Sequence, residues 1–362
     1  MKINGIDIGF GFTKATNGEE SIIFKSIVGE ASDIQFSLDI VGNKLTDNFH
    51  VALDGQHFFI GKLAEQQSNV RLFTLDQARF ISDFMKAFAL TALGHLTDEY
   101  VLLNIVSGLP VGFYKDYRQT FAKILTGSHE ITFHKPDGSS EVKRLKIDEI
   151  RIIPQPLGSV LNLLMDENGT ITNWDLARQK VGVVDIGFRT TDLCVLNQLQ
   201  YEERGSTTTD TGMAKGFNII SRKLREQCGV NVELYRMYTA IETGSIKIRG
   251  EEVNITKLRD QVFANAARTI ATDVDRLWAD DWDMDAIIIT GGGAMELAKI
   301  LQPLITGNVI PLKHNIDARL SNVQGYLKYG RHLWDKAEPN TSDSASERQN
   351  QPEEKTNGPS SP

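Results

Sequence analysis

The sequence predicts an α/β protein with two domains, and three observations support this prediction. Apolar runs of strand length alternate with segments of helical periodicity along the chain. The strand-and-turn sequence DIGF occurs twice, at residues 7–10 and 185–188, and the segments that follow the two copies have similar plans. The length of 362 residues is sufficient for two complete hydrophobic cores.

The first half of the chain starts with an alternating pattern over residues 1–16, which predicts a β-hairpin. Residues 77–94 carry apolar side chains at helical spacing and predict an amphipathic helix. The apolar run 100–110 predicts a strand that ends in a Gly/Pro loop, and residues 112–125 predict a helix. Pro-Asp-Gly within residues 130–145 predicts the turn of a second hairpin.

The second half repeats this plan. Residues 181–196 predict a buried strand, a turn and a returning strand. Residues 214–228 and 256–278 place apolar side chains on one side of two helices. The segment AIIITGGGAMELAKIL, residues 286–301, indicates a strand, a glycine turn and a helix. Residues 337–362 contain no large apolar side chain, and we expect them to form a disordered polar tail.

Composition and charge restrict the possible functions. The net charge of −8 argues against direct binding to nucleic acid, because phosphate contacts need clustered Lys and Arg, although a basic adaptor could still hold DNA. No apolar stretch approaches membrane-spanning length, and no signal-peptide pattern precedes the first strand, so we expect a cytoplasmic protein without a membrane span. Two cysteines are too few for a disulfide framework.

The two DIGF copies place the same residue types at the same spacing. Each delivers an aspartate at a strand end, a glycine two positions later and a threonine six positions later: Asp7, Gly9 and Thr13, then Asp185, Gly187 and Thr191. Aspartate is depleted in strands, so its presence at both strand ends favours a pair of phosphate-binding hairpins whose carboxylates hold Mg²⁺. Lys14, present only in the first copy, would add a charge on the phosphates. Two ordinary hairpins with tight turns are the alternative interpretation of the repeat.

A third motif places Gly291, Gly292 and Gly293 between a buried strand and a helix. Free N–H groups and the helix dipole make such a turn a site for phosphate or ribose, although a simple tight turn is the alternative. Other chemistries lack their sequence patterns: there is no P-loop, no dinucleotide-binding fingerprint and no nucleophile elbow, and the seven histidines are scattered without His-x-x-x-His spacing.

The order and spacing of the three motifs resemble those of the actin-like ATPases, the superfamily of actin, the sugar kinases and the heat-shock chaperones. IIPQPLGSVL, with Gln155, is similar to the first connecting helix of that superfamily, and SNVQGYLKYG is similar to the second connecting segment. The resemblance extends from residue 1 to about residue 335. The two hairpin motifs look most like those of the ParM/StbA-type prokaryotic actins, which segregate plasmids by forming ATP-dependent filaments.

The resemblance implies the actin-like (RNase H-like) fold, in which two similar domains with mixed β-sheets and flanking helices surround a nucleotide cleft. Domain I would cover residues 1–170, with a small irregular insertion at about 29–75. The Gly-, Asp- and Asn-rich composition of residues 29–50 also indicates a less regular insertion. Domain II would cover residues 171–320, and a C-terminal helix over 321–336 would return to domain I.

The resemblance also implies ATP and Mg²⁺ as cofactors and assigns the site. Asp7 and Asp185 would act as the metal-binding residues on opposite sides of the attacking water, and Gln155 would orient this water; these three form the predicted catalytic set. The predicted nucleotide-binding residues are Gly9, Phe10, Gly11, Phe12, Thr13, Lys14, Gly187, Phe188, Arg189, Thr190, Gly216, Lys223, Glu226, Gly291, Gly292 and Gly293.

Several of these assignments carry alternatives or depart from the resemblance. Lys223 and Glu226 would face ribose or adenine, with a solvated helix face as the alternative. Phe10 stands where actin has a hydroxyl group near the γ-phosphate. Arg189 stands where many relatives have glycine, so it must point out of the turn or contact phosphate.

Three functions are compatible with this interpretation. The first is an ATP-dependent filament former that binds itself and, through an adaptor protein, DNA or another cargo for plasmid segregation or intracellular positioning. The second is a small-molecule kinase on the same fold, although glutamine at residue 155 suits water better than a sugar hydroxyl. The third is a binding module, such as a pilus-associated or chaperone-like ATP-binding protein.

Overall fold

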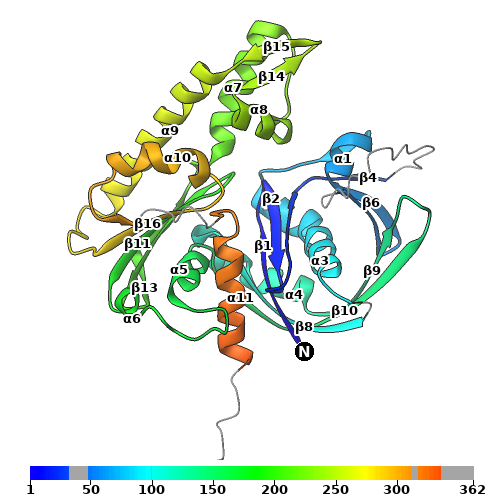
Figure 1. Cartoon of the computed structure of the whole chain (residues 1–362), viewed down its shortest axis with the longest axis horizontal. Coiled ribbons are helices and arrows are strands. Elements are labelled where there is room, and N and C mark those ends of the chain that lie inside the picture. The colour runs from blue at the N-terminus through cyan, green and yellow to red at the C-terminus, as the bar shows by residue number, and fades with distance from the viewer. Residues whose placement is uncertain (32–47, 99, 311–316, 336–362) are drawn as a thin grey trace, which may run out of the picture.

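The computed structural model describes residues 1–31, 48–98, 100–310 and 317–335. It contains a ten-stranded sheet built from the first half of the chain and a five-stranded sheet built from the second half (Figure 1). The strands of the first sheet, in spatial order, are β3 (Ser21–Lys25), β2 (Phe12–Thr16), β1 (Lys2–Ile8), β8 (Tyr100–Leu109), β10 (Ser140–Pro154), β9 (Gly127–His134), β5 (Asn48–Leu53), β6 (Gln56–Gly61), β4 (Val28–Glu30) and β7 (Arg71–Leu72).

The second sheet repeats the first five positions of this order. Its strands are β13 (Gln200–Thr209), β12 (Thr191–Asn197), β11 (Lys180–Ile186), β16 (Ala286–Thr290) and β17 (Val309–Ile310). In both sheets a central strand pairs antiparallel with the strand that follows it and parallel with a later strand. Beyond the antiparallel neighbour, the next strand is again antiparallel (β3 beside β2, β13 beside β12). Beyond the parallel neighbour, the next strand is again parallel (β10 beside β8, β17 beside β16). The predicted α/β fold with two similar mixed sheets is therefore confirmed.

Helices cover both faces of each sheet. On the first sheet, α3 (Met85–His95) and α4 (Val111–Leu125) pack on one face, and α11 (Ser321–Trp334) packs on the other. On the second sheet, α7 (Met213–Cys228), α9 (Thr256–Leu277) and α10 (Ala294–Leu301) form one layer, and α5 (Leu157–Leu164) and α6 (Trp174–Ala177) form the other. Strand β11 is buried throughout, as a strand covered on both faces must be.

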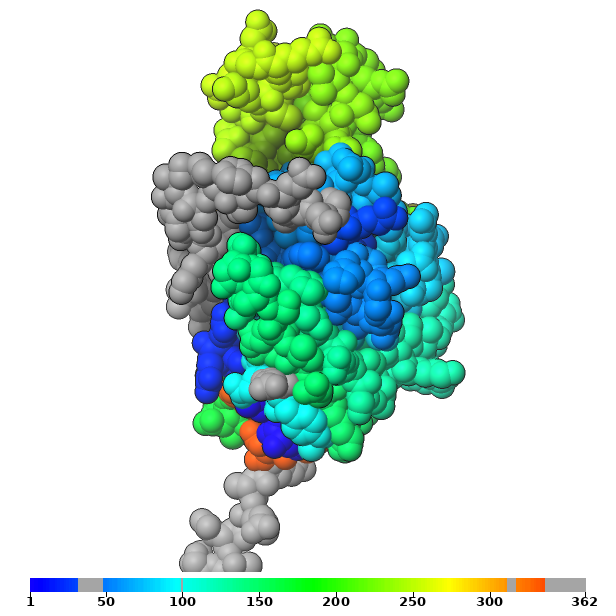
Figure 2. All heavy atoms as spheres, turned by 90° about the vertical axis from the view of Figure 1, so that its right-hand side faces the viewer, coloured from blue at the N-terminus to red at the C-terminus, as the bar shows by residue number. Residues whose placement is uncertain are grey.

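Two further groups of elements project from these layers. Helix α8 (Met237–Thr243) and the hairpin of β14 (Ser245–Ile248) and β15 (Glu251–Asn254) stand at the far end of the second half. They belong to the yellow-green lobe at the top of Figure 2. Helix α1 (Lys62–Gln67) packs on β6 beside the first sheet. Among the described residues, no helix combines the length and the apolar character that a membrane span requires.

The predicted elements agree with the structure at most positions. The helix predicted over 77–94 consists of α2 (Gln77–Arg79), a π-helical turn at Phe80–Phe84 and α3. The insertion predicted at about 29–75 is more regular than expected: β5 alternates inward and outward side chains and extends the first sheet. Its residues 32–47 lie outside the described residues, as does the predicted tail over 337–362.

Helices α5 and α11 cross in direct backbone contact and connect the layers of the two sheets. A Cβ atom on Gly325 of α11 would overlap the carbonyl oxygen of Gly158 of α5, so this crossing requires glycine. The fully buried ring of Tyr326 fills the space beside it. Its hydroxyl group donates a hydrogen bond to the carbonyl oxygen of Gln155, 3.1 Å away, immediately before α5. The crossing therefore sets the position of Gln155.

Candidate functional site

The turns of the two DIGF hairpins have the same hydrogen-bond geometry. In the first, the N–H of Gly9 donates to the carbonyl oxygen of Phe12 at 3.1 Å. In the second, the N–H of Gly187 donates to the carbonyl oxygen of Thr190 at 2.8 Å. The register of each hairpin places the aspartate at the end of its first strand opposite the residue seven positions later. The recurrence of DIGF therefore reflects one local structure used in both halves.

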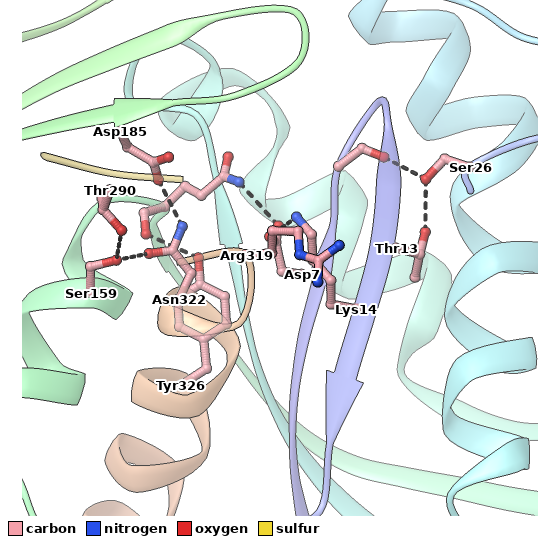
Figure 3. A network of polar contacts seen from close by, with 12 residues as sticks. Asp7, Thr13, Lys14, Ser26, Ser159, Asp185, Thr290, Arg319, Asn322 and Tyr326 are labelled. Carbon is pink, nitrogen blue, oxygen red and sulfur yellow. Dashed lines mark hydrogen bonds and ion pairs between the residues drawn. The ribbon is translucent and has the colours of Figure 1, made fainter. Parts of the chain in front are cut away.

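Asp7 joins the first hairpin to the connecting segment before α5. Its carboxylate is buried and accepts a hydrogen bond from Lys14 Nζ on Oδ2 at 2.7 Å and from Gln155 Nε2 on Oδ1 at 3.0 Å (Figure 3). Lys14 lies directly opposite Asp7 in the hairpin register. The structure thus brings together Asp7, Lys14 and Gln155, three residues that the sequence analysis assigned to one site.

Asp185, the equivalent residue of the second hairpin, has no cation beside it in the described structure. It is buried, and its Oδ2 accepts a hydrogen bond from Asn322 Nδ2 of α11 at 2.7 Å. Burial raises the pKa of Asp185 to about 7; the hydrogen bond from Asn322 opposes this rise, and the nearby carboxylates of Asp192 and Asp7 add to it. The second carboxylate is therefore poorly neutralised, whereas the first is paired with Lys14.

The glycine turn of the third motif lies directly against Asp185. Gly291 has a φ of +87°, and a Cβ atom there would overlap Oδ1 of Asp185. The N–H of Gly293 donates to the carbonyl oxygen of Ile186 at 2.8 Å, which joins the turn to the end of β11. A residue with a side chain at position 291 would combine backbone strain with a steric clash.

Replacing Gly291 by alanine is expected to lower the free energy of unfolding by about 2–4 kcal/mol, because the left-handed φ and the contact with Asp185 both oppose a Cβ atom. Gly292→Ala is the matched control. Gly292 is exposed and has open space around it, so its change is expected to stay within about 0.5 kcal/mol. Urea unfolding followed by circular dichroism measures both values, and equal losses in the two variants would contradict the assigned geometry.

Both hairpin turns and the glycine turn line one cavity of about 290 Å³. Phe12 and Phe188, one from each turn, lie against the partly buried ring of Tyr238 from α8. Of the predicted site residues, the following line the cavity: Gly9, Phe10, Gly11, Phe12, Lys14, Gln155, Gly187, Phe188, Arg189, Thr190, Gly292 and Gly293. Two halves of the chain therefore contribute equivalent turns to one concave site.

Comparison with known families agrees with this arrangement on both sides of the cavity. The family "Actin like proteins N terminal domain" matches residues 5–158, which contain the first hairpin and Gln155. The family "Archaeal actin homologue MreB-like, C-terminal" matches residues 183–303, which contain the second hairpin and the glycine turn. Both family models describe domains of actin-like proteins, and each matches the residues on one side of the cavity in this actin-like chain.

Two archaeal proteins are similar to the chain over nearly their whole length. The actin-like chain is 26% identical over 347 residues to an archaeal actin homolog of Thermoplasma acidophilum, with 90% of this chain and 98% of the relative covered. A homolog of Thermoplasma volcanium is 26% identical over 349 residues, with the same coverage.

Two solved structures share the fold of the actin-like chain. The crystal structure of the archaeal actin homolog Ta0583 superposes with a TM-score of 0.76 at 22% identity and covers 92% of this chain and 100% of its own. A 15-stranded ParM filament from Clostridium botulinum has a TM-score of 0.76 at 24% identity and covers 91% and 99%. The resemblance to ParM-type prokaryotic actins is confirmed at the level of fold.

Arg189 of the actin-like chain points into the wall of the cavity. Its guanidinium group lies 5.4 Å from the ring centroid of Phe10 and 5.2 Å from that of Phe113, at the start of α4. Its Nη2 lies 3.7 Å from the exposed Asp210, and its buried Nη1 has no hydrogen-bond partner among the described residues. A donor is therefore available beside the first turn, and the contact of Arg189 with phosphate stays a prediction.

Besides Asp7, Asp185 and Gly291, which lie directly behind the turns, four predicted residues do not line the cavity. Thr13 is buried behind the first hairpin, where its hydroxyl group pairs with Ser26 at 3.0 Å. Gly216 faces Val262 inside the layer of α7 and α9. Lys223 and Glu226 pair with each other at 2.6 Å on the exposed face of α7. Their contact with a nucleoside stays a prediction, and the ion pair agrees with the alternative of a solvated helix face.

The sequence analysis missed a polar network behind the site. Asn322, which holds Asp185, accepts a hydrogen bond from Ser159 at 2.6 Å, and Ser159 also pairs with Thr290 at 2.7 Å (Figure 3). All three residues are buried. They come from α11, α5 and β16, respectively, so no local pattern connects them. The only available signal was that Asn322 and Ser159 stand in the two segments identified as connecting segments.

Asp192 was also missed, and it occupies in the second hairpin the position that Lys14 occupies in the first. Its buried carboxylate accepts hydrogen bonds from the N–H of Val111 at 2.8 Å and from Thr208 Oγ1 at 2.5 Å. Burial raises its pKa to about 6. Val111 is the first residue of α4. Its hydrogen bond to Asp192 therefore connects the first half of the chain to the second sheet beside the cavity.

Proposed function

We propose that the chain binds ATP with Mg²⁺ in the cavity between the two hairpins and hydrolyses it. One observation carries this proposal: equivalent turns from the two halves line one cavity, with the carboxylates of Asp7 and Asp185 behind them. The wall also presents three cationic side chains, Lys14, Arg189 and Arg319, which suit a polyphosphate. A solved complex of the archaeal actin homolog Ta0583 with ADP, with a TM-score of 0.74, supports a nucleotide as the ligand.

The residues present fit Mg²⁺. Carboxylate oxygens are the ligands this ion prefers, and Asp185 is a buried carboxylate with no cationic side chain bonded to it among the described residues. We assign Asp185 and Asp7 to the ion, directly or through water. When bound, Mg²⁺ neutralises charge on the phosphates and on these carboxylates.

Different groups of the cavity have different roles in hydrolysis. The backbone N–H groups of the first turn and the Lys14 ammonium group bind phosphate oxygens, and the free Nη1 of Arg189 adds a donor beside them. Gln155 donates its Nε2 hydrogen to Asp7, which leaves Oε1 to accept a hydrogen bond from the attacking water. Gln155 thus contributes orientation rather than basicity. Gly292 and Gly293, at the opposite wall, pack against the nucleoside.

We further propose that ATP binding drives assembly of the chain into filaments. The ParM filament from Clostridium botulinum and the archaeal actin homologs, which resemble nearly the whole chain, support this function. Residues 1–170 and 171–320 would act as two domains that close on the nucleotide, with the helix over 321–336 on domain I. Because the net charge is −8, a separate adaptor would connect the filament to DNA or another cargo for plasmid segregation or positioning in the cytoplasm.

Right-angle light scattering tests the filament proposal. Purified chain at tens of micromolar with Mg²⁺ is expected to scatter strongly when ATP or a non-hydrolysable ATP analogue is added, and weakly with ADP. Scattering with ATP is expected to decay as the nucleotide is consumed, whereas scattering with the analogue persists. GTP serves as the comparison nucleotide. A chain that never scatters or pellets with ATP or the analogue would overturn the filament proposal.

A further inference from the structure

Three of the seven histidines, scattered in the sequence, gather on one face of the first sheet. They are His50 of β5, His57 of β6 and His134 of β9, which are neighbouring strands. The register places His50 opposite His134, and His57 opposite Ala52, which is two positions from His50. All three side chains therefore leave the sheet on the same side. Figure 2 looks onto the side of the molecule where the green β9–β10 hairpin adjoins blue residues of the first half.

The imidazole rings lie close enough to share one ion. The ring centroids of His50 and His134 are 4.5 Å apart, and those of His57 and His134 are 5.0 Å apart. One ring nitrogen from each residue lies within 4.8 Å of the other two. Ligand nitrogens around a tetrahedral zinc ion, with Zn–N distances of about 2.0–2.1 Å, are roughly 3.4 Å apart. A small rotation of the side chains would bring the three ring nitrogens to this separation, and the exposed His57 is free to rotate.

His134 has the hydrogen bonding of a metal ligand. Its Nδ1 lies 2.8 Å from Ser140 Oγ on the paired strand β10, and its buried Nε2 has no hydrogen-bond partner among the described residues. A hydrogen bond from Nδ1–H to Ser140 leaves the lone pair on Nε2, and such second partners are typical of metal-binding histidines.

We propose that His50, His57 and His134 form a binding site for one divalent transition-metal ion of the zinc class, with a fourth position open to water. Three imidazoles without a carboxylate favour such an ion over Mg²⁺, which prefers oxygen ligands. The site is therefore chemically distinct from the carboxylate site at Asp7 and Asp185. A bound ion would join β9, β5 and β6 at the outer part of the first sheet, away from the cavity.

Titration of the untagged, nucleotide-free full chain with Co²⁺ tests the proposal, because tetrahedral Co²⁺ gives intense visible absorption. One equivalent is expected to bind, and excess Zn²⁺ is expected to displace it. His57→Ala, an exposed position, is expected to weaken Co²⁺ binding by at least about a hundredfold, and Ser140→Ala by roughly tenfold.

His129→Ala is the matched control, because His129 lies on the same strand as His134 but faces the other side of the sheet. It is expected to bind Co²⁺ as the wild type does. Circular dichroism establishes that each variant is folded. Absence of Co²⁺ binding by the wild type, or equal Co²⁺ affinity of wild type and His57→Ala, would overturn the proposal, whatever the chain does with ATP.

Discussion

Replacing Gln155 by alanine is expected to slow ATP hydrolysis by about a hundredfold, while assembly with ATP persists. Gln155 lines the cavity, and Asp7 and Tyr326 hold its side chain and its backbone carbonyl. Loss of the side chain removes the group that orients water without removing a phosphate or metal ligand. Phosphate release and pelleting, measured on the same samples, separate the two effects. Asp185→Ala is expected to slow hydrolysis in the same direction and still to permit ATP-bound assembly.

Gln324→Ala provides the control for Gln155→Ala. Gln324 is a second glutamine close to the same helix crossing, but its side chain accepts a hydrogen bond from Asn162 and does not line the cavity. Its hydrolysis rate is expected to match that of the wild type. If Gln155→Ala hydrolyses ATP at the wild-type rate, the assignment of the water-orienting residue is wrong.

Asp185→Asn is expected to stabilise the nucleotide-free chain at pH 8 by on the order of 2–4 kcal/mol. The buried carboxyl group has a pKa of about 7 in the folded chain, against 3.8 in the unfolded chain. Between these values the folded state binds more protons, so the free energy of unfolding of the wild type falls as the pH rises from about 4 to about 7. Asparagine has no charge to desolvate and still accepts the hydrogen bond from Asn322.

Urea unfolding in EDTA across this pH range measures the effect. The stability difference between Asp185→Asn and the wild type is expected to grow from pH 4 to pH 7 and to remain constant above it. Asp210→Asn changes an exposed carboxylate and is expected to show no such pH dependence. A variant less stable than the wild type at pH 8 would contradict the view that Asp185 is a destabilising residue kept for ligand binding.

The fold could be predicted from the sequence to a large extent because its signals are local. The buried strands 181–186 and 286–290, the glycine turns and the amphipathic helix 214–228 each appear as a continuous pattern, and the structure contains all of them. The pairing of the two DIGF copies could also be predicted, because each copy holds its aspartate, glycine turn and returning strand within ten residues.

The rest of the site could not be predicted, because it depends on contacts between distant segments. Asn322 meets Asp185 across 137 positions of sequence, and only the crossing of α5 and α11 brings them together. The strand order β9-β5-β6 brings the three histidines together, and the spacing of the histidines in the sequence does not indicate this order. Lys223 is a different case: the sequence analysis gave a solvated helix face as the alternative for this residue, and its exposed ion pair with Glu226 agrees with that alternative.

Lys14 and Asp192 distinguish the roles of the two hairpins. They are equivalent in register, yet one carries a cation beside its aspartate and the other carries a second carboxylate. The first hairpin is therefore suited to phosphate, and the second concentrates negative charge, which suits a metal ion. This asymmetry agrees with the division of work that we propose.

Isothermal titration of the nucleotide-free chain with ATP tests the central claim most directly. We expect one ATP per chain with a Kd in about the micromolar range when Mg²⁺ is present, and binding at least about tenfold weaker in EDTA or in Lys14→Ala. Lys115→Ala, which removes an exposed cation of α4 that does not line the cavity, is the matched control and is expected to bind as the wild type does. No binding up to about 1 mM ATP, or equal affinity in wild type and Lys14→Ala, would contradict a nucleotide site between the two hairpins.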